Sequence, residues 1–165
     1  MLASLVRTSL GIIFTAVLLS PANADDVVAI KTDIILTVSS GMDVLTLDRS
    51  DLSKLTVTSF DTSTIWTDGV HTFTGVSVKT LIDLIGVTNG MLRATAINNY
   101  AIEIPVSDAV NEGPIIAYLM DGKKMSVRDK GPLWIVYPYD ANPDYRSEVV
   151  YSRSIWQLDR IEFVQ

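Results

Sequence analysis

The 165-residue sequence carries 13 basic and 19 acidic side chains, one histidine and no cysteine, and its formal net charge is −6. An acidic surface repels polyanions, which argues against a nucleic-acid-binding protein. A single histidine cannot build a histidine-based metal site. Without cysteine, stability must come from an apolar core and not from disulfide bonds.

The first 24 residues are typical of a cleavable signal peptide. The apolar run at residues 10–19 follows Arg7 and is too short to span a bilayer of about 30 Å as a helix. The tripeptide Ala22-Asn23-Ala24 fits the small-x-small rule of signal peptidase. An uncleaved membrane anchor is the disfavoured alternative. We expect export, cleavage after Ala24 and one soluble domain at residues 25–165, with a net charge of −7 because only Arg7 is lost from the count.

Short segments with the two-residue period of β-strands dominate the rest of the chain. We expect strands at residues 34–38, 44–47, 55–58, 92–97, 101–104, 115–120, 123–127, 133–137 and 157–164. Residues 48–52 can form one helical turn. Residues 60–68 are polar and are expected to form an exposed loop. Residues 138–144, rich in Pro, Asp and Asn, are expected to form another loop. Strand 133–137 is apolar on both faces and is expected to be central.

The best helix is predicted at residues 78–85. Ser77 can cap its start, and Gly86 can supply the left-handed residue that ends it. Its apolar residues fall on one face. Many short strands with one good helix indicate an α+β domain dominated by mixed sheet.

Three polar segments are candidates for ligand binding. In Asn98-Asn99-Tyr100, side-chain amides can pair with the edge of a heterocycle, although the segment alone is better explained as an Asn-rich turn. Residues 127–134 place Arg128, Asp129 and Lys130 before a buried strand, and a solvated turn explains them equally well.

The third segment, residues 151–158, contains Arg153, Ser154 and Trp156. An arginine and an indole suit a planar, electron-poor ligand. The alternative is a core tryptophan covered by the stem of Arg153. Catalytic signatures are missing: there is no glycine-rich phosphate loop, no cysteine nucleophile, no paired-histidine motif and no triad pattern around His71.

Five segments in register resemble the molybdopterin-binding domain of sulfite oxidases and related oxidoreductases. They are residues 73–87, 98–100, 116–122, 130–133 and 154–158. The resemblance spans about residues 56–164 and implies an α+β, mixed-sheet fold of that type with few short helices. In those enzymes a cysteine binds molybdenum. The corresponding stretch here, about residues 60–66, has none, and the hydroxyls of Thr62, Ser63 and Thr64 are poor substitutes for a thiolate.

Within that family, the sequence is similar to stand-alone exported proteins that lack the cysteine, including periplasmic pterin-binding proteins. This resemblance implies a reduced pterin without molybdenum as ligand, no metal and no redox catalysis. It also implies a partner, the periplasmic region of an inner-membrane enzyme that makes or degrades cyclic di-GMP, and hence an influence on biofilm formation. The alternatives are a molybdopterin-dependent oxidoreductase or a subunit of one, and an interaction protein with a vacant pocket.

The candidate ligand-binding residues combine ring-stacking side chains with polar side chains for the ring edge. They are Trp66, Asn98, Tyr100, Arg128, Asp129, Lys130, Arg153, Ser154 and Trp156. Arg153 and Trp156 are the strongest of these candidates, whereas Trp134 is expected to belong to the core. No catalytic or metal-binding residue is expected.

Overall fold

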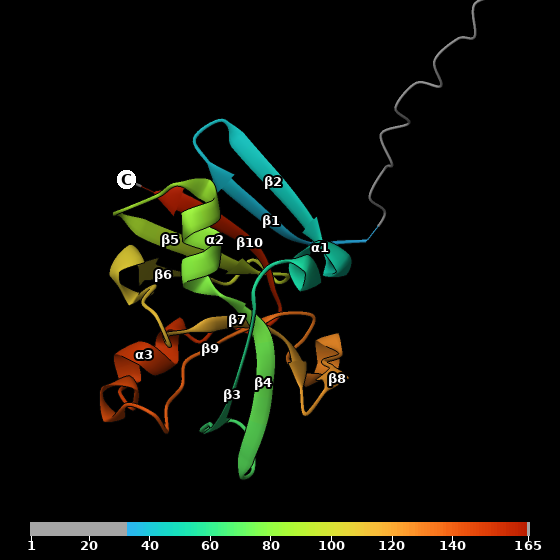
Figure 1. Ribbon diagram of the computed structural model, residues 1–165, viewed down its shortest axis with the longest axis vertical. Coiled ribbons are helices and arrows are strands. Elements are labelled where there is room, and N and C mark those ends of the chain that lie inside the picture. The colour runs from blue at the N-terminus through green and yellow to red at the C-terminus, as the bar shows by residue number, and fades with distance from the viewer. Residues whose placement is uncertain (1–32, 165) are drawn as a thin grey trace, which may run out of the picture. The chain divides into compact units, whose positions relative to one another are not determined.

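A first five-stranded sheet has the order β2-β1-β10-β5-β6 (Figure 1). The computed structural model describes residues 33–164, and the expected signal peptide lies outside them. The strands of this sheet are β1 (Ile34–Ser40), β2 (Asp43–Asp48), β5 (Met91–Ala96), β6 (Ala101–Pro105) and β10 (Leu158–Val164). Strand β10 runs parallel to β1, and the other neighbours in the sheet are antiparallel.

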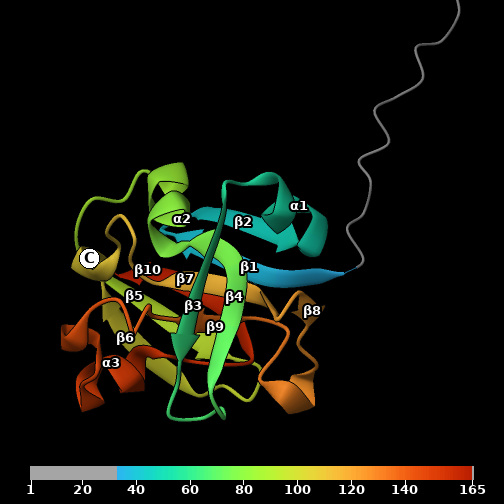
Figure 2. The same cartoon turned by 60° about the horizontal axis from the view of Figure 1, so that its bottom comes forward.

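A second, antiparallel sheet is built on β7. It has the order β3-β4-β7-β8, and β9 also pairs with β7. Its strands are β3 (Val57–Ser63), β4 (Val70–Ser77), β7 (Ile115–Met120), β8 (Lys123–Lys124) and β9 (Trp134–Val136). The β3–β4 hairpin extends beyond the other strands and carries its turn at its far end (Figures 1 and 2).

Short helices connect the strands. They are α1 (Arg49–Lys54), α2 (Val78–Ile85), α3 (Glu148–Arg153) and the 3-10 turns η1 (Val106–Asp108), η2 (Val127–Asp129) and η3 (Pro143–Tyr145). Helix α2 has the predicted bounds, with the Ser77 hydroxyl accepting from the Thr80 amide at 2.9 Å and Gly86 left-handed. Among the described residues, no helix is long and apolar enough to cross a membrane.

One apolar cluster joins the two sheets. Leu36 and Val38 of β1 are fully or almost fully buried in the same cluster as Val76 of β4 and Ile115 of β7. The close approach of β4 to β7 depends on Gly75, because a Cβ there would lie 2.1 Å from the Ile116 carbonyl oxygen. The α+β, mixed-sheet prediction is confirmed.

Several local predictions are wrong for identifiable reasons. Residues 60–63 form part of β3 and not a loop, because β3 is an edge strand whose polar side chains can face water while its backbone pairs with β4. Strand β4 was missed because a register shift between Thr74 and Gly75 interrupts its alternation. Strand β9 is buried but not central: among the strands of residues 33–164, β7 is its one partner, with a single bridge to Trp156 on its other side.

Two shorter elements also differ from the predictions. Strand β8 ends at Lys124, because Met125 turns into the core and Ser126 caps the 3-10 turn that follows. Helix α3 was not predicted, since its six residues are too few for a helical period to show.

Candidate functional site

A cavity of about 370 Å³ opens between the two sheets' connecting segments. It is lined by Trp66, Ala96, Asn98, Tyr100, Tyr151, Ser152, Ser154, Ile155, Trp156 and Gln157. Three connections supply this lining: the β3–β4 turn, the β5–β6 turn and the segment from α3 to β10. The structure thus brings together five of the nine predicted residues: Trp66, Asn98, Tyr100, Ser154 and Trp156.

Four of the ten lining residues are aromatic: Trp66, Tyr100, Tyr151 and Trp156. The ring of Trp66 lies edge-to-face with three others, at centroid distances of 5.6 Å to Trp156, 5.8 Å to Tyr151 and 5.9 Å to Trp134. Trp134 is fully buried, as predicted for a core residue, whereas Trp156 is 37 % and Tyr100 56 % exposed. Edge-to-face packing fixes the ring planes, so Trp66 and Trp156 present a rigid apolar surface to a flat ligand.

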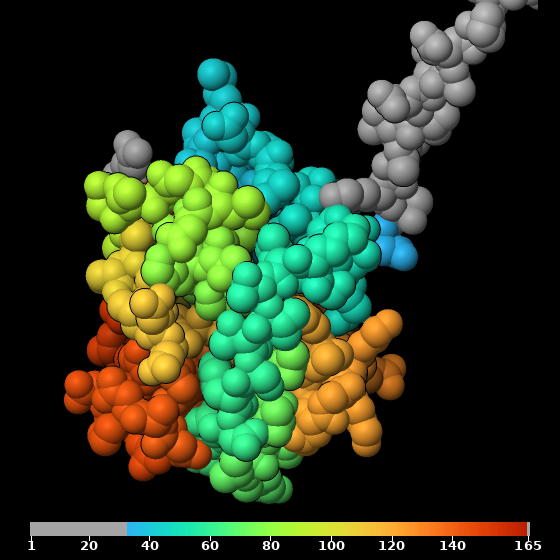
Figure 3. All heavy atoms as spheres, in the orientation of Figure 1, coloured from blue at the N-terminus to red at the C-terminus, as the bar shows by residue number. Residues whose placement is uncertain are grey.

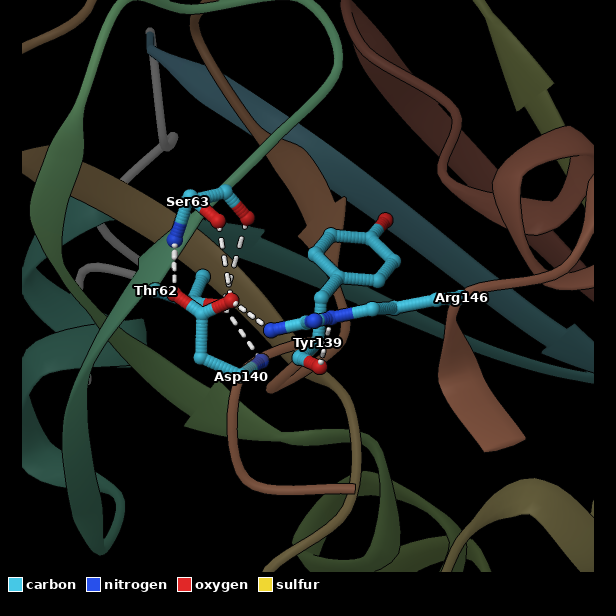
Figure 4. Close-up of polar contacts among 5 residues, drawn as sticks. All are labelled: Thr62, Ser63, Tyr139, Asp140 and Arg146. Carbon is cyan, nitrogen blue, oxygen red and sulfur yellow. Dashed lines mark hydrogen bonds and ion pairs between the residues drawn. The ribbon is translucent and has the colours of Figure 1, made fainter. Parts of the chain in front are cut away.

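A polar network holds the strand end that precedes Trp66 (Figure 4). The Asp140 carboxylate accepts from the Ser63 amide at 2.6 Å and from its hydroxyl at 2.8 Å, and it pairs with Arg146 at 2.5 Å. The Asp140 amide donates to the buried Thr62 hydroxyl at 3.1 Å. The hydrogen bonds from Ser63 and the Arg146 guanidinium lower the pKa of Asp140, so the carboxylate stays charged and the loop after β9 stays fastened to β3.

Two amides supply the polar edge of the cavity. The Asn98 Oδ1 accepts from the Tyr100 amide at 3.0 Å, which leaves its NH₂ group as a donor. The Gln157 Nε2 donates to the Val127 carbonyl at 2.7 Å, which leaves its Oε1 as an acceptor. The cavity therefore offers one amide donor and one amide acceptor beside its aromatic wall.

Ser154 lines the cavity, but its hydroxyl is engaged in hydrogen bonds within the protein. The side chain is buried, and its hydroxyl donates to the Val150 carbonyl at 3.2 Å and hydrogen-bonds to the Tyr139 hydroxyl. Burial raises the pKa of Tyr139 to about 12, so this pair stays neutral at physiological pH.

The four predicted charged residues do not line the cavity. Arg153, the last residue of α3, forms an ion pair with Asp108 of η1 at 2.8 Å. Asp129 accepts from the Ser126 hydroxyl at 2.7 Å within η2, and Arg128 is exposed beside it. The Lys130 ammonium lies 5.6 Å from the Trp134 ring centroid, outside the lining.

Sequence reasoning missed five lining residues: Ala96, Tyr151, Ser152, Ile155 and Gln157. Four of the five, Tyr151, Ser152, Ile155 and Gln157, belong to the third polar segment, so the segment was identified but these members were not chosen from it. Arg153 carried the strongest chemical signal, yet the helical turn of α3 directs its neighbours to the cavity and Arg153 to Asp108.

The arrangement of these elements agrees with a family model described as the oxidoreductase molybdopterin-binding domain, which matches residues 48–141, more than half of the 165-residue chain. This chain belongs to that family. A search of curated proteins found no match to this chain. The family match includes Trp66 and the Asn98–Tyr100 turn, whereas residues 151–157 follow the matched region.

The family's cofactor is a pterin that carries molybdenum, and the residues of this chain fit only part of it. An uncharged aromatic cavity with free amide groups suits the flat, polar-edged pterin ring. The metal does not fit a thiolate-bound site, because the chain has no cysteine. The Thr62 hydroxyl donates to the Ser63 carbonyl and accepts from the Asp140 amide, and the Ser63 hydroxyl donates to the Asp140 carboxylate. Within residues 33–164, no cluster of three His, Cys, Asp or Glu side chains is placed to hold a metal ion.

Proposed function

We propose that this protein is a periplasmic pterin-binding protein that reports a reduced pterin, free of molybdenum, to a membrane partner without redox catalysis. The observation that carries the proposal is the cavity lined by Trp66 and Trp156, in a molybdopterin-binding-domain fold whose chain has no cysteine. The fold supports a pterin-type ligand, and the donor set disfavours a thiolate-held metal.

The cavity chemistry suits an uncharged ring. None of its ten lining side chains is charged. Burying a phosphate dianion without a cation in contact would cost several kcal/mol, whereas a neutral pterin loses only hydrogen bonds with water that the two amides can replace. The aromatic wall supplies the stacking surface. We therefore assign ring recognition to Trp66, Trp156, Asn98 and Gln157.

The location and the partner rest on sequence. The N-terminal 24 residues have the pattern of a signal peptide, which supports a periplasmic location. The resemblance to stand-alone pterin-binding proteins supports the periplasmic region of an inner-membrane enzyme that makes or degrades cyclic di-GMP as the partner. Under this proposal, the protein acts by contact with that enzyme and carries out no chemistry of its own.

Calorimetry with tetrahydrobiopterin, an uncharged reduced pterin, tests the proposal. We expect saturable binding to the purified protein. At a ligand concentration 100 times the dissociation constant, thermal unfolding should show a stabilisation of about 2.7 kcal/mol. Well-folded protein that binds neither this nor any other reduced pterin would refute the proposal.

A matched pair of variants within one turn tests the site. Asn98→Asp keeps the oxygen that accepts from the Tyr100 amide but replaces the NH₂ donor with a charged oxygen, and we expect binding to weaken about tenfold or more. Asn99→Asp makes the same chemical change outside the cavity, where the Asn99 Oδ1 accepts from Arg160 at 2.7 Å. This control should bind as wild type, and equal effects of the two substitutions would contradict the placement of the ligand.

A further inference from the structure

Six of the eleven Lys and Arg side chains in residues 33–164 form an ion pair or a hydrogen bond, and most of the others lie in one segment. Lys54, Lys79, Arg146, Arg153 and Arg160 each form an ion pair, and Arg49 donates to the Tyr118 carbonyl. The side chains of five cations in residues 33–164 have no ion pair or hydrogen bond, and one of the five, Lys130, lies over the Trp134 ring. They are Arg93, Lys123, Lys124, Arg128 and Lys130.

Four of those five lie within eight residues, which we call the cationic lobe (residues 123–130). The lobe comprises β8, η2 and the residues between and after them, and it forms the projecting orange surface at the right of Figure 3. It contains one acid, Asp129, whose carboxylate is held by Ser126. Next to the lobe, Asp121 is bound to His71. Val127, at the middle of the lobe, is 51 % exposed.

Gln157 connects this lobe to the ligand cavity. Its Nε2 donates to the Val127 carbonyl at 2.7 Å, and its backbone amide donates to the Lys130 carbonyl at 3.1 Å. The same side chain lines the cavity. A ligand that forms a hydrogen bond with the Gln157 side-chain amide therefore contacts the same residue that is hydrogen-bonded to the lobe.

We propose that the cationic lobe is the docking surface for an acidic protein partner, and that Gln157 transmits the occupancy of the cavity to it. The proposal rests on the proposed function for the ligand and adds the partner's chemistry. Opposite charges at the rim of an interface accelerate and orient association, and the exposed Val127 supplies an apolar contact among them. A localised acidic patch fits better than an anionic membrane, because a membrane would also repel the remainder of this acidic protein; the 165 residues together carry a net charge of −6.

Site-specific photocrosslinking in the organism that encodes the protein tests the proposal. A photoreactive residue replaces Val127, and a control replaces Val57, which is equally exposed at 50 % but lies on β3, at the opposite edge of the second sheet. We expect position 127 to crosslink to a membrane protein whose exported region is acidic, and position 57 not to. Added tetrahydrobiopterin should change the yield at position 127 at least about twofold.

Charge variants give the matched comparison. Lys123→Gln with Lys124→Gln should lower the crosslink yield about tenfold. Lys54→Gln with Lys79→Gln removes the same charge from helices α1 and α2 and should leave the yield unchanged. Calorimetry on each variant separates the two proposals: lost crosslinking with intact pterin binding supports the lobe, and crosslinking without pterin binding refutes only the proposed ligand.

Three results would overturn the inference. They are an equal yield from both lysine pairs, a crosslink yield that is unchanged by a pterin that calorimetry shows to bind, and lobe-dependent binding to phosphatidylglycerol vesicles without a protein crosslink. The last result would assign the lobe to a lipid surface.

Discussion

The Arg153 guanidinium lies 2.8 Å from the Asp108 carboxylate, and the same carboxylate oxygen accepts from the Tyr137 hydroxyl at 2.7 Å. Both members of the pair are mostly buried, with side chains 23 % and 17 % exposed. Burial raises the pKa of Tyr137, so its hydroxyl remains a donor. The pair joins the end of α3 to η1, and α3 in turn carries one wall of the cavity.

Arg153→Ala should therefore act mainly on stability. We expect a loss of about 1.5–3 kcal/mol in the free energy of unfolding, because a charge-assisted hydrogen bond is removed and Asp108 loses its partner. Chemical denaturation measures this loss. Tetrahydrobiopterin affinity of the folded variant should stay within about threefold of wild type. A variant of normal stability that binds tenfold more weakly would restore Arg153 to the ligand site, where the sequence first suggested it.

Gly75→Ala should destabilise the fold by about 3 kcal/mol or more, because the added Cβ would meet the Ile116 backbone at 2.1 Å in the middle of the second sheet. Gly41→Ala is the control. Gly41 has a φ of +59° but nothing within 4 Å of an added Cβ, so it should cost only about 1–2 kcal/mol. Urea denaturation of both variants measures the two losses in unfolding free energy. Equal losses would show that the close approach of β4 to β7 does not restrict the residue at position 75.

Local chemistry explains which elements the sequence predicted well. Helix α2 carries its own start and stop in Ser77 and Gly86, and β7 is an uninterrupted apolar run. Strand β3 owes its existence to pairing with β4, which no local pattern of Phe60–Ser63 encodes. The site follows the same division: Trp66, Trp156 and Asn98 were found by residue type. The direction of Arg153, by contrast, depends on Asp108, 45 positions away along the chain.

Export predicts a defined mature N-terminus. Signal peptidase cleaves after small residues at the last and third-last positions, which here are Ala24 and Ala22. N-terminal sequencing of the protein from a periplasmic fraction should therefore begin at Asp25. Recovery of chains that retain Met1 in the inner membrane would contradict both the cleavage and the proposed location.

Metal content distinguishes the pterin-binding proposal from an oxidoreductase. We expect no stoichiometric molybdenum in protein purified from its native compartment, and no sulfite oxidation, because the chain has no thiolate to hold the metal. Elemental analysis with an activity assay measures both. About one molybdenum per chain would reverse the order of the two functions.

His71 links the turn that carries Trp66 to the β7–β8 turn. Its Nδ1 lies 2.7 Å from the Asp121 carboxylate, and its Nε2 lies 3.0 Å from the Asp68 carbonyl. Both partners are acceptors, so both contacts are hydrogen bonds only when the imidazole carries two protons. The Asp121 hydrogen bond, opposed by burial, raises the pKa of His71 above its ordinary 6.5. The same bond and the Thr72 amide lower the pKa of Asp121 below 3.8.

The contribution of His71 to stability should consequently depend on pH. The pKa of His71 is higher in the folded protein than in the unfolded chain, so the protonated imidazole stabilises the fold. This stabilisation is fully present below pH 6.5 and is lost as pH rises through the folded-state pKa of His71. The lowered pKa of Asp121 adds stability above pH 3.8, which is lost on acidification. The melting temperature of wild type should therefore exceed that of His71→Gln most between these two pH values, and the difference should shrink toward pH 8–9.

Nearby Asp68 favours the protonated ring, whereas Lys123 acts on Asp121, so Lys123→Gln should preserve the pH dependence as a control. A difference between wild type and His71→Gln that is constant from pH 5 to 9 would show that this imidazole does not titrate in its two hydrogen bonds.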